Sequence, residues 1–233
     1  MNMKVLKSVC ACTLALSMLA GSACSSMSQT GKGALIGGGG GAAVGAGLGA
    51  LIGGGKGAGI GSAIGAAVGA GAGALIGRKM DKQQKELEQI QGAQVEQTTD
   101  QNGLQAIKVT FEGGILFPSG KWTLTQSAKN ALSQFATSLN QNPNTNVQIY
   151  GFTDNTGGYE INKEVSTERA NAVKLFLVQH GVAGTRITAE GMPLTDYVAS
   201  NETAAGRAQN RRVEIYISAD QKMIQEAEAG TLK

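Results

Sequence analysis

The sequence predicts an α/β fold, a βαβαββ sandwich over residues 104–219 in which helices cover one face of a four-stranded sheet. Some segments have apolar residues at every second position, as in half-buried strands, and others have apolar residues at helical spacing. The two kinds of segment alternate along the chain. A Gly/Ala-rich stretch before them predicts a separate helical hairpin, and the first residues have the form of a signal peptide. One compact domain therefore follows a membrane-compatible element.

The elements of the domain can be placed in chain order. Period-two alternation and β-branched residues mark four strands, at 107–111, 147–149, 186–190 and 213–217. The first helix has an apolar face that comprises Leu124, Ala128, Ala131, Leu132, Phe135 and Leu139. Thr123 and Gln126 have the spacing of a capping box at its start, and Asn142-Pro143 closes it. A second helix runs from about 159 to 180, where Gly181 stops it.

The Gly/Ala-rich stretch keeps a strict period. A glycine stands at every fourth position from Gly33 to Gly77, and the residues between are mostly Ala, Leu, Ile and Val. This spacing places a stripe without side chains along a helix, where another backbone can approach closely. Basic residues leave two uncharged spans, 33–55 and 57–77, each near the roughly 20 residues that cross a bilayer. We expect 33–77 to form a membrane hairpin that packs between its arms or as a homo-oligomer; a disordered spacer is the alternative.

Residues 1–23 have the form of a bacterial signal peptide: a positive start, an apolar run and small residues. The region before Cys24 resembles the lipobox of bacterial lipoproteins, in which the cysteine is acylated before cleavage, although Gly21 stands where Leu is usual. We expect Cys24 to carry the lipid (palmitate) and 24–32 to form a lipidated segment at the membrane. Ordinary cleavage that leaves a free thiol at Cys24 is the alternative.

Composition limits the partners and the chemistry. Residues 78–102, dense in Gln, Lys and Glu, predict a linker that is helical at first and then loose, and residues 220–233 are expected to form a C-terminal tail. The formal charge of +3, from 20 Lys and Arg against 17 Asp and Glu, comes without a basic stripe, which argues against nucleic acid as a partner. With one histidine and no cysteine after Cys24, we expect no metal and no cofactor.

The helix expected at 159–180 carries an anomaly. Asn162 and Arg169 fall inside its apolar sector, which also contains Ile161. An arginine aimed at a core needs an anion, because an unpaired buried charge is costly. Asp154, in the turn before the helix, is the nearby carboxylate. An internal salt bridge and a ligand site are therefore both open.

Separated motifs in this part of the chain stand in a fixed order. They are Gly151-Phe152-Thr153-Asp154-Asn155-Thr156-Gly157, Asn162, Ser166-Thr167-Glu168-Arg169-Ala170, Asn201-Glu202-Thr203 and Gly206-Arg207-Ala208-Gln209-Asn210-Arg211-Arg212-Val213. Together they resemble the OmpA-like peptidoglycan-binding domain shared with Pal and MotB, over residues 104–219. The arrangement of signal, glycine zipper and carboxy-terminal domain is similar to the YiaD-type outer-membrane lipoproteins.

The resemblance implies non-covalent binding of peptidoglycan at the diaminopimelate of its stem peptide. The family's aspartate falls on Asp154, which would pair with the ligand ammonium, and its arginine falls on Arg169, which would hold the ligand carboxylate. The family commonly has His where this chain has Phe152, which alters the wall of the site but not the charge pair. Matching positions that would add hydrogen bonds are Thr153, Asn155 and Asn162.

A second group of polar residues precedes the last strand, and it either holds the loop in place as a brace or makes accessory ligand contacts: Arg207, Asn210, Arg211 and Arg212.

Three classes of function remain: a lipid-anchored tether between outer membrane and cell wall, an oligomeric, channel-like or stator-like membrane component, and an enzyme acting on peptidoglycan. No Ser/His/Asp, Cys/His or zinc constellation supports the enzyme. Neither apolar arm holds the ionisable residue that ion coupling needs. The sequence therefore favours the tether, at the outer membrane with its carboxy-terminal domain facing the periplasm.

Overall fold

The computed structural model describes residues 69–118 and 120–232, and its centre is a five-stranded sheet with the order β1-β2-β5-β3-β4. The strands are β1 (Ala93–Thr99), β2 (Gln105–Glu112), β3 (Thr145–Phe152), β4 (Ile187–Met192) and β5 (Arg212–Ala219). Neighbouring strands are antiparallel except β3 and β4, which are parallel. The expected signal peptide, Cys24 and most of the 33–77 hairpin lie outside the described residues.

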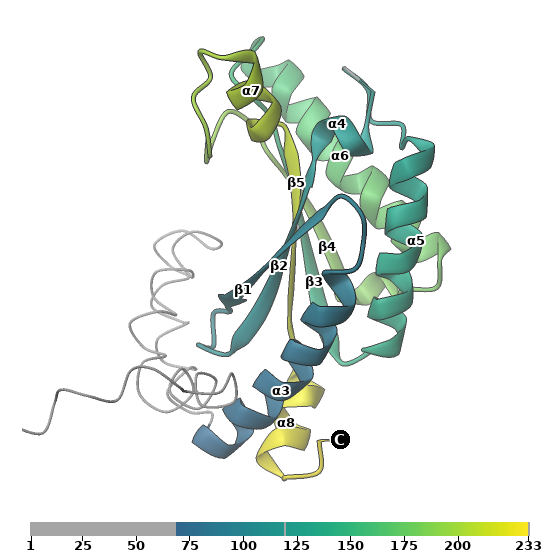
Figure 1. Cartoon of the computed structure of the whole chain (residues 1–233), viewed down its shortest axis with the longest axis vertical. Coiled ribbons are helices and arrows are strands. Elements are labelled where there is room, and N and C mark those ends of the chain that lie inside the picture. The colour runs from purple at the N-terminus through teal and green to yellow at the C-terminus, as the bar shows by residue number, and fades with distance from the viewer. Residues whose placement is uncertain (1–68, 119, 233) are drawn as a thin grey trace, which may run out of the picture.

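The helices of the described part follow the predicted alternation and lie mainly on one side of the sheet (Figure 1). Helices α5 and α6 pack against each other, and α6 also packs on β3 and β4. The bounds of the helices in the described residues are α3 (Ala70–Leu87), α4 (Gly113–Leu116), α5 (Gln126–Gln141), α6 (Tyr159–Gln179), the 3-10 turn η2 (Gly184–Arg186), α7 (Ala204–Asn210) and α8 (Gln221–Glu228).

The core forms where these helices meet the sheet. Val213, Ile215 and Ile217 of β5 are fully buried, and their alternation points them to the same face. The ring of Phe111 on β2 meets that of Phe135 on α5 edge to face, with centroids 6.2 Å apart. The predicted α/β sandwich is confirmed, with a fifth strand, β1, that the sequence pattern did not indicate.

The predicted helix ends are mostly confirmed. Asn142 follows the last residue of α5, and Gly181, with φ of 89°, follows α6. The start of α5 was predicted wrongly, because Thr125 rather than Thr123 is the N-cap. Its hydroxyl oxygen accepts the amide hydrogen of Ala128 at 3.0 Å. The helix therefore begins at Gln126.

The segment expected to be a linker, 78–102, is part of the folded domain. Helix α3 buries Ile76, Met80 and Leu87 completely, because their spacing puts them on one face. It packs on α8, α5 and β2, and Gln105 Nε2 of β2 donates a hydrogen bond to Asp81 Oδ1 at 2.6 Å. Strand β1 pairs with β2 along its whole length. The expected boundary between hairpin and linker falls inside α3.

The expected C-terminal tail, 220–233, is also mostly folded. Asp220 caps α8 by accepting a hydrogen bond from the amide of Met223 at 2.7 Å. Met223 and Ile224 are buried against the core. No helix within 69–118 or 120–232 has both the length and the apolar character that a bilayer span needs.

The buried face of α6 differs from the expected apolar sector. Ile161 was placed in that sector, but its side chain is 64% exposed. The buried residues of the first half of α6 are polar, Asn162, Ser166 and Arg169, whereas those of the second half are apolar, including Val173 and Leu177. The second half of α6 therefore packs on the core, and the first half contributes polar groups to the end of the sheet.

We predict that Met80→Ala lowers the free energy of unfolding by about 2 to 5 kcal/mol, because it leaves a cavity under α3. A true linker would tolerate the change. Urea unfolding followed by tryptophan fluorescence measures it, with Lys85→Ala, an exposed position on the same helix, as the control. Equal stabilities of the two variants would contradict the docking of α3.

Candidate functional site

Three segments meet beyond the end of β3. The chain leaves β3 at Phe152 and passes through Asp154 before α6 begins, and Arg211 immediately precedes β5. Because Gly151 pairs with Val213, the exit of β3 lies beside the entry of β5. The backbone of Arg211 is fixed by the amide of Gly113, which donates to its carbonyl oxygen at 2.6 Å. Asp154 and Arg211 are therefore neighbours although they lie far apart in the sequence.

Asp154 is buried, with 6% of its surface exposed, and both of its carboxylate oxygens accept hydrogen bonds. Oδ1 accepts the amide hydrogen of Thr156 at 2.8 Å, and Oδ2 accepts from Nη1 of Arg211 in a salt bridge. Burial acts to raise the pKa of Asp154, but the hydrogen bond from Thr156 and the charge of Arg211 outweigh it, so the pKa lies below the usual value. The carboxylate is therefore ionised at neutral pH.

Arg169 is as buried as Asp154, with 5% of its surface exposed, but the two form no ion pair in the described structure. Its Nε donates to the carbonyl oxygen of Lys121 at 3.1 Å, and its guanidinium lies 5.2 Å from the ring centroid of Phe117. Burial lowers its pKa, nearby Arg211 lowers it further, and Asp154 opposes both. The internal salt bridge with Asp154, open from the sequence, is thus absent from the described residues, and Arg211 takes that place.

The position of Arg169 depends on a close approach of α6 to the sheet. Gly151 and Gly191 are partners in the β3–β4 register, and both lie under the first half of α6. A Cβ at Gly151 would come 2.3 Å from the carbonyl oxygen of Ser166, and one at Gly191 would come 2.4 Å from Oγ1 of Thr167. Only a residue without a side chain fits at either position. The two glycines therefore let the polar half of α6 approach the site.

The remaining residues named by the resemblance hold the loops. Oγ1 of Thr153 accepts the backbone amide hydrogen of Leu194 at 3.2 Å. The backbone amide of the exposed Asn155 donates to Oδ1 of Asn201 at 3.3 Å. Asn162 is 5% exposed, and its Nδ2 donates to the carbonyl oxygens of Thr156 and Gly158 at 2.9 and 3.1 Å. In this structure all three fix the turn that carries Asp154.

Of the four residues proposed as braces or accessory contacts, three act as braces in this structure. Arg207 donates to the carbonyl oxygens of Asn201 and Glu202, and fully buried Asn210 bonds Val198, Ala199 and Asn201. Arg212 pairs with Glu214 at 2.7 Å and stacks on Phe152 at 3.9 Å. Phe152, the departure from the family's usual His, thus packs against a cation. Arg211 alone of the four joins Asp154, and no local sequence pattern distinguishes it.

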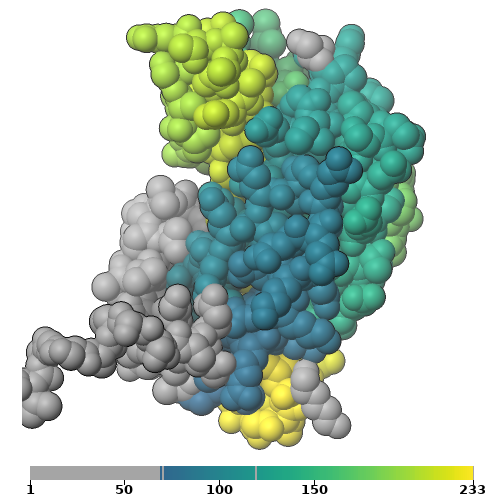
Figure 2. All heavy atoms as spheres, in the orientation of Figure 1, coloured from purple at the N-terminus to yellow at the C-terminus, as the bar shows by residue number. Residues whose placement is uncertain are grey.

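These segments lie together at one end of the molecule, where α4, α7 and the start of α6 gather (Figure 1). Helix α7 and the loop before it stand out from the rest of the surface as a lobe (Figure 2). No group of three or more His, Cys, Asp or Glu side chains within the described residues is placed to hold a metal ion. The site offers two cations and one anion instead.

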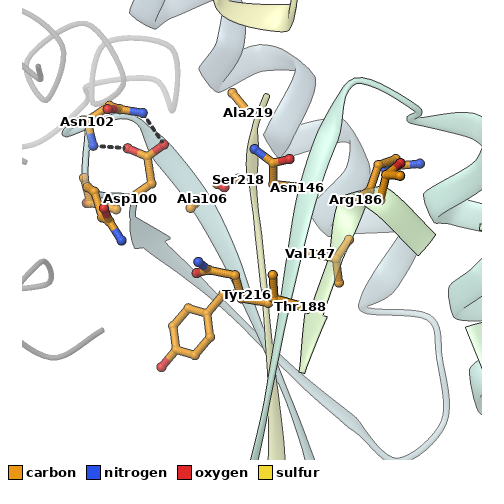
Figure 3. A pocket seen from close by; sticks show the side chains of 14 residues that line it. Asp100, Asn102, Ala106, Asn146, Val147, Arg186, Thr188, Tyr216, Ser218 and Ala219 are labelled. Carbon is orange, nitrogen blue, oxygen red and sulfur yellow. Dashed lines mark hydrogen bonds between the residues drawn. The ribbon is translucent and has the colours of Figure 1, made fainter. Parts of the chain in front are cut away.

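A separate hollow of about 270 Å³ lies at the other end of β3, beside Asn146 and Val147 (Figure 3). Burial raises the pKa of Asp100 at its edge to about 6, although the amides of Leu104 and Asn102 donate to this carboxylate. Arg186, also on its lining, donates to the carbonyl oxygens of Leu139, Asn142 and Thr145. Its guanidinium is therefore committed to the backbone, and the described lining of this hollow holds no other cation that could bind a ligand carboxylate.

Comparison with known proteins assigns both parts of the chain. Residues 116–211 match the OmpA family, and residues 3–81 match the YMGG-like Gly-zipper family. The chain is 39% identical over 112 residues to the probable lipoprotein YiaD of Escherichia coli (strain K12), covering 48% of this chain and 51% of that one. It is 40% identical over 113 residues to the peptidoglycan-binding protein ArfA of Mycobacterium tuberculosis (strain H37Rv), covering 48% and 35%. It thus spans about half of YiaD and about a third of ArfA.

Solved structures agree with this assignment. The cell wall anchor of the T6SS from Pseudomonas aeruginosa is similar with a TM-score of 0.50 and 31% identity, over 60% of this chain and 97% of that one. A putative MotB like protein from Desulfovibrio vulgaris shares the fold with a TM-score of 0.53 and 24% identity, over 63% and 94%. The resemblance seen in the sequence is confirmed: a segment that matches a Gly-zipper family precedes one that matches the OmpA family.

The lowered pKa of Asp154 predicts a dependence of stability on pH. A carboxylate whose folded-state pKa is depressed stabilises the fold above its unfolded pKa, about 3.9, and this stabilisation is lost as the pH falls through the folded-state pKa. The difference in unfolding free energy between the wild type and Asp154→Asn should therefore shrink as the pH falls from about 5 to about 2. Thermal unfolding measures it, with exposed Glu164→Gln as the control. A difference independent of pH would refute the lowered pKa.

Proposed function

We propose that the OmpA family domain binds peptidoglycan non-covalently, at the diaminopimelate of the stem peptide, and thereby tethers the outer membrane to the cell wall. The relatives support this proposal. ArfA is named a peptidoglycan-binding protein, and the similar solved structure is a cell wall anchor. YiaD is named a probable lipoprotein. These names describe binding and anchoring proteins, which favours a binding module over an enzyme.

The observation that carries the proposal is the state of Arg169. Its guanidinium is buried and ionised, yet its hydrogen-bond and ring partners among the described residues are only the carbonyl oxygen of Lys121 and the ring of Phe117. With Arg211 and Asp154, the cluster has an excess of one positive charge. A buried cation without an acidic partner is costly, and a bound carboxylate would remove that cost. The terminal nitrogens of the guanidinium are available for such a bidentate contact.

Diaminopimelate offers the complementary charges. The end of its side chain carries an ammonium group and a carboxylate on the same carbon atom. Arg169 would hold the carboxylate, and Asp154 would accept hydrogen bonds from the ammonium. Asp154 Oδ2 is shared with Arg211, whose side chain is 40% exposed and can move aside or remain as a second contact to the carboxylate. Two buried charges of opposite sign thus select a zwitterion over a simple anion.

Thr153, Asn155 and Asn162 support this site through the backbone. Their side chains or amides tie the turn at 153–158 to the loops around it, so the ligand would meet a turn that is already ordered. Ordering the turn in advance lowers the entropy lost on binding. We infer that substitution of Thr153 or Asn162, whose side chains make these hydrogen bonds, weakens binding indirectly by loosening Asp154, whereas Asn155 contributes its backbone amide.

We predict that Asp154→Ala and Arg169→Ala each lower binding to purified sacculi by at least about tenfold, because a charged hydrogen bond contributes roughly 1.5 to 3 kcal/mol. Arg169→Lys should fail as well, since an ammonium cannot reproduce the bidentate fork. Sacculus pull-down measures binding, and thermal unfolding confirms that each variant is folded. Glu164→Ala, an exposed change on the same helix, is the matched control. Full binding by a folded Asp154→Ala protein would remove the site from Asp154.

For the anchor, we propose that residues 1–23 are removed as a signal peptide and that Cys24 is acylated, which would hold the chain at the outer membrane with its carboxy-terminal domain in the periplasm. The match of residues 3–81 to a glycine-zipper family and the likeness to a probable lipoprotein support this. The glycine stripe within 33–77 would add backbone contact between its arms or between chains. Two such elements are what stable attachment usually needs.

We predict that Cys24→Ser moves a large part of the chain out of the outer-membrane fraction, because the acyl chains are lost. Fractionation after digestion of the wall separates the lipid contribution from retention by peptidoglycan. A conservative change outside the lipobox, Ser26→Ala, is the control. Mass spectrometry of the mature amino terminus decides the matter directly, and an unmodified Cys24 would end the proposal.

A further inference from the structure

The hollow of about 270 Å³ at the start of β3 lies in the face of the sheet that is turned away from the core (Figure 3). Ile217 of β5 points to the core, so its neighbours Tyr216 and Ser218 point to the opposite face. The hollow follows from a step in side-chain size on this face. Ala106 on β2 and Ser218 are small, whereas the next residues along the two strands, Lys108 and Tyr216, are large and lie opposite each other.

The strand register places the polar lining residues beside one another. Asn146 on β3 is the partner of Ser218 on β5. Gln148 on β3 has partners on both sides, Tyr216 on β5 and Thr188 on β4. Partner residues on neighbouring strands lie about 5 Å apart and share a face of the sheet. These five side chains therefore form one continuous surface in the hollow.

Four of the five side chains have no hydrogen-bond partner within the described residues: Asn146, Gln148, Thr188 and Ser218. The amides and the hydroxyls each offer both a donor and an acceptor. An apolar ligand would cover these groups without replacing the hydrogen bonds that they make to water, which is costly. The hollow therefore suits a ligand that carries many hydrogen-bonding groups of its own.

Tyr216 is the aromatic residue of this lining, and its ring is held in place. Its hydroxyl donates to Oε2 of Glu214 at 2.8 Å, and its ring meets that of Tyr150 edge to face, with centroids 5.8 Å apart. Burial, together with the charge of Glu214, raises the pKa of the Tyr216 phenol, so the hydroxyl keeps its proton. Because the hydroxyl is occupied, the ring offers apolar surface to a ligand.

Two charged residues of the lining limit the charge that a ligand can carry. Arg186 is committed to backbone carbonyl oxygens, as described above. Oδ1 of Asp100 accepts the backbone amides of Asn102 and Leu104 at 2.8 and 2.9 Å, whereas Oδ2 has only Nδ2 of Asn102 at 3.5 Å. Oδ2 can therefore accept a ligand hydroxyl. An anionic ligand would find no cation for its carboxylate in the described lining.

We propose that this hollow is a second binding site, and that it takes a neutral saccharide. The neighbouring hydroxyls of a pyranose ring match the donors and acceptors of the side-chain amides, and its apolar C–H face packs on an aromatic ring. The site is distinct from the one proposed for diaminopimelate. Asn146 and Asp154 are separated by roughly 25 Å of chain, at about 3.3 Å per extended residue.

The test uses the full-length chain in micelles of a detergent without a sugar head group. Saturation-transfer difference NMR measures binding of two probes, triacetylchitotriose, built from N-acetylglucosamine, and maltotriose, built from glucose. At least one of them should give a signal that saturates with concentration. Gln148→Ala and Asn146→Ala should each raise the half-saturation concentration about 3- to 10-fold, because each removes a hydrogen-bonding amide.

The control is Gln94→Ala, which removes an exposed amide at the far end of β1 and should change neither signal. Thermal unfolding confirms that each variant is folded, and Asn146 is exposed, so its substitution leaves the core intact. Absence of a saturable signal from both probes would overturn the site. So would wild-type affinity in both Gln148→Ala and Asn146→Ala.

Charged sugars test the class of ligand. Glucuronate and glucosamine, an anion and a cation, should compete less well for the site than glucose does. Stronger competition by either charged sugar would overturn the assignment to a neutral saccharide.

Two further comparisons identify the source of the saccharide and separate this site from the proposed function. Asp154→Ala should leave saccharide binding unchanged, and its loss in that variant would overturn the independence of the two sites. If the source is the glycan of the wall, triacetylchitotriose should bind more tightly than maltotriose. The double variant Asp154→Ala, Gln148→Ala should then retain less sacculus binding than Asp154→Ala alone. If the source is a soluble oligosaccharide, maltotriose should bind more tightly and the two variants should retain equal sacculus binding.

Discussion

The domain depends on keeping the guanidinium of Arg169 buried at the end of a sheet without a carboxylate beside it. The nearest acid, Asp154, is already paired with Arg211, so the cluster keeps one excess positive charge. Its cost is limited by the carbonyl oxygen of Lys121 and a neighbouring aromatic ring. The fold supplies the stability that this arrangement requires, through a core that lies under the other half of α6. The buried polar groups and the apolar packing surface are thus divided along the length of one helix.

The fold could be predicted largely from periodicity, because four of the strands repeat their apolar residues at a period of two and helices α5 and α6 repeat theirs at helical spacing. Strand β1 was missed since Val95 is its one large apolar residue, and an edge strand paired on one side needs little apolar pattern. A helical start to the linker was predicted, but the packing of α3 on the core was not, because buried Gln83 interrupts the apolar stripe between Met80 and Leu87. The Lys and Gln residues of this segment are typical of a linker, and a linker was therefore predicted. A heptad count would have revealed the packing of α3.

The site could be predicted only in part. The motifs named Asp154, Arg169 and Asn162, and all three are buried in the turn after β3 and the first half of α6, which are local in sequence. The partner of Asp154 is Arg211, and this depends on the register of β3 against β5, which no local pattern records.

The geometry of α3 changes what a tether built from this chain would look like. Helix α3 begins within the glycine zipper and ends against the core, and its 18 residues make it about 27 Å long. Between Ala70 and the core, within the part of the chain that the structure describes, no loose spacer interrupts this helix, so the orientation of the domain follows that of the helix. The start of α3 lies with α8 at one end of the sheet, whereas α4, α7 and the charged cluster lie at the other (Figure 1). With the zipper held in a membrane, as proposed, the docked helix would turn the cluster away from that membrane and toward the wall.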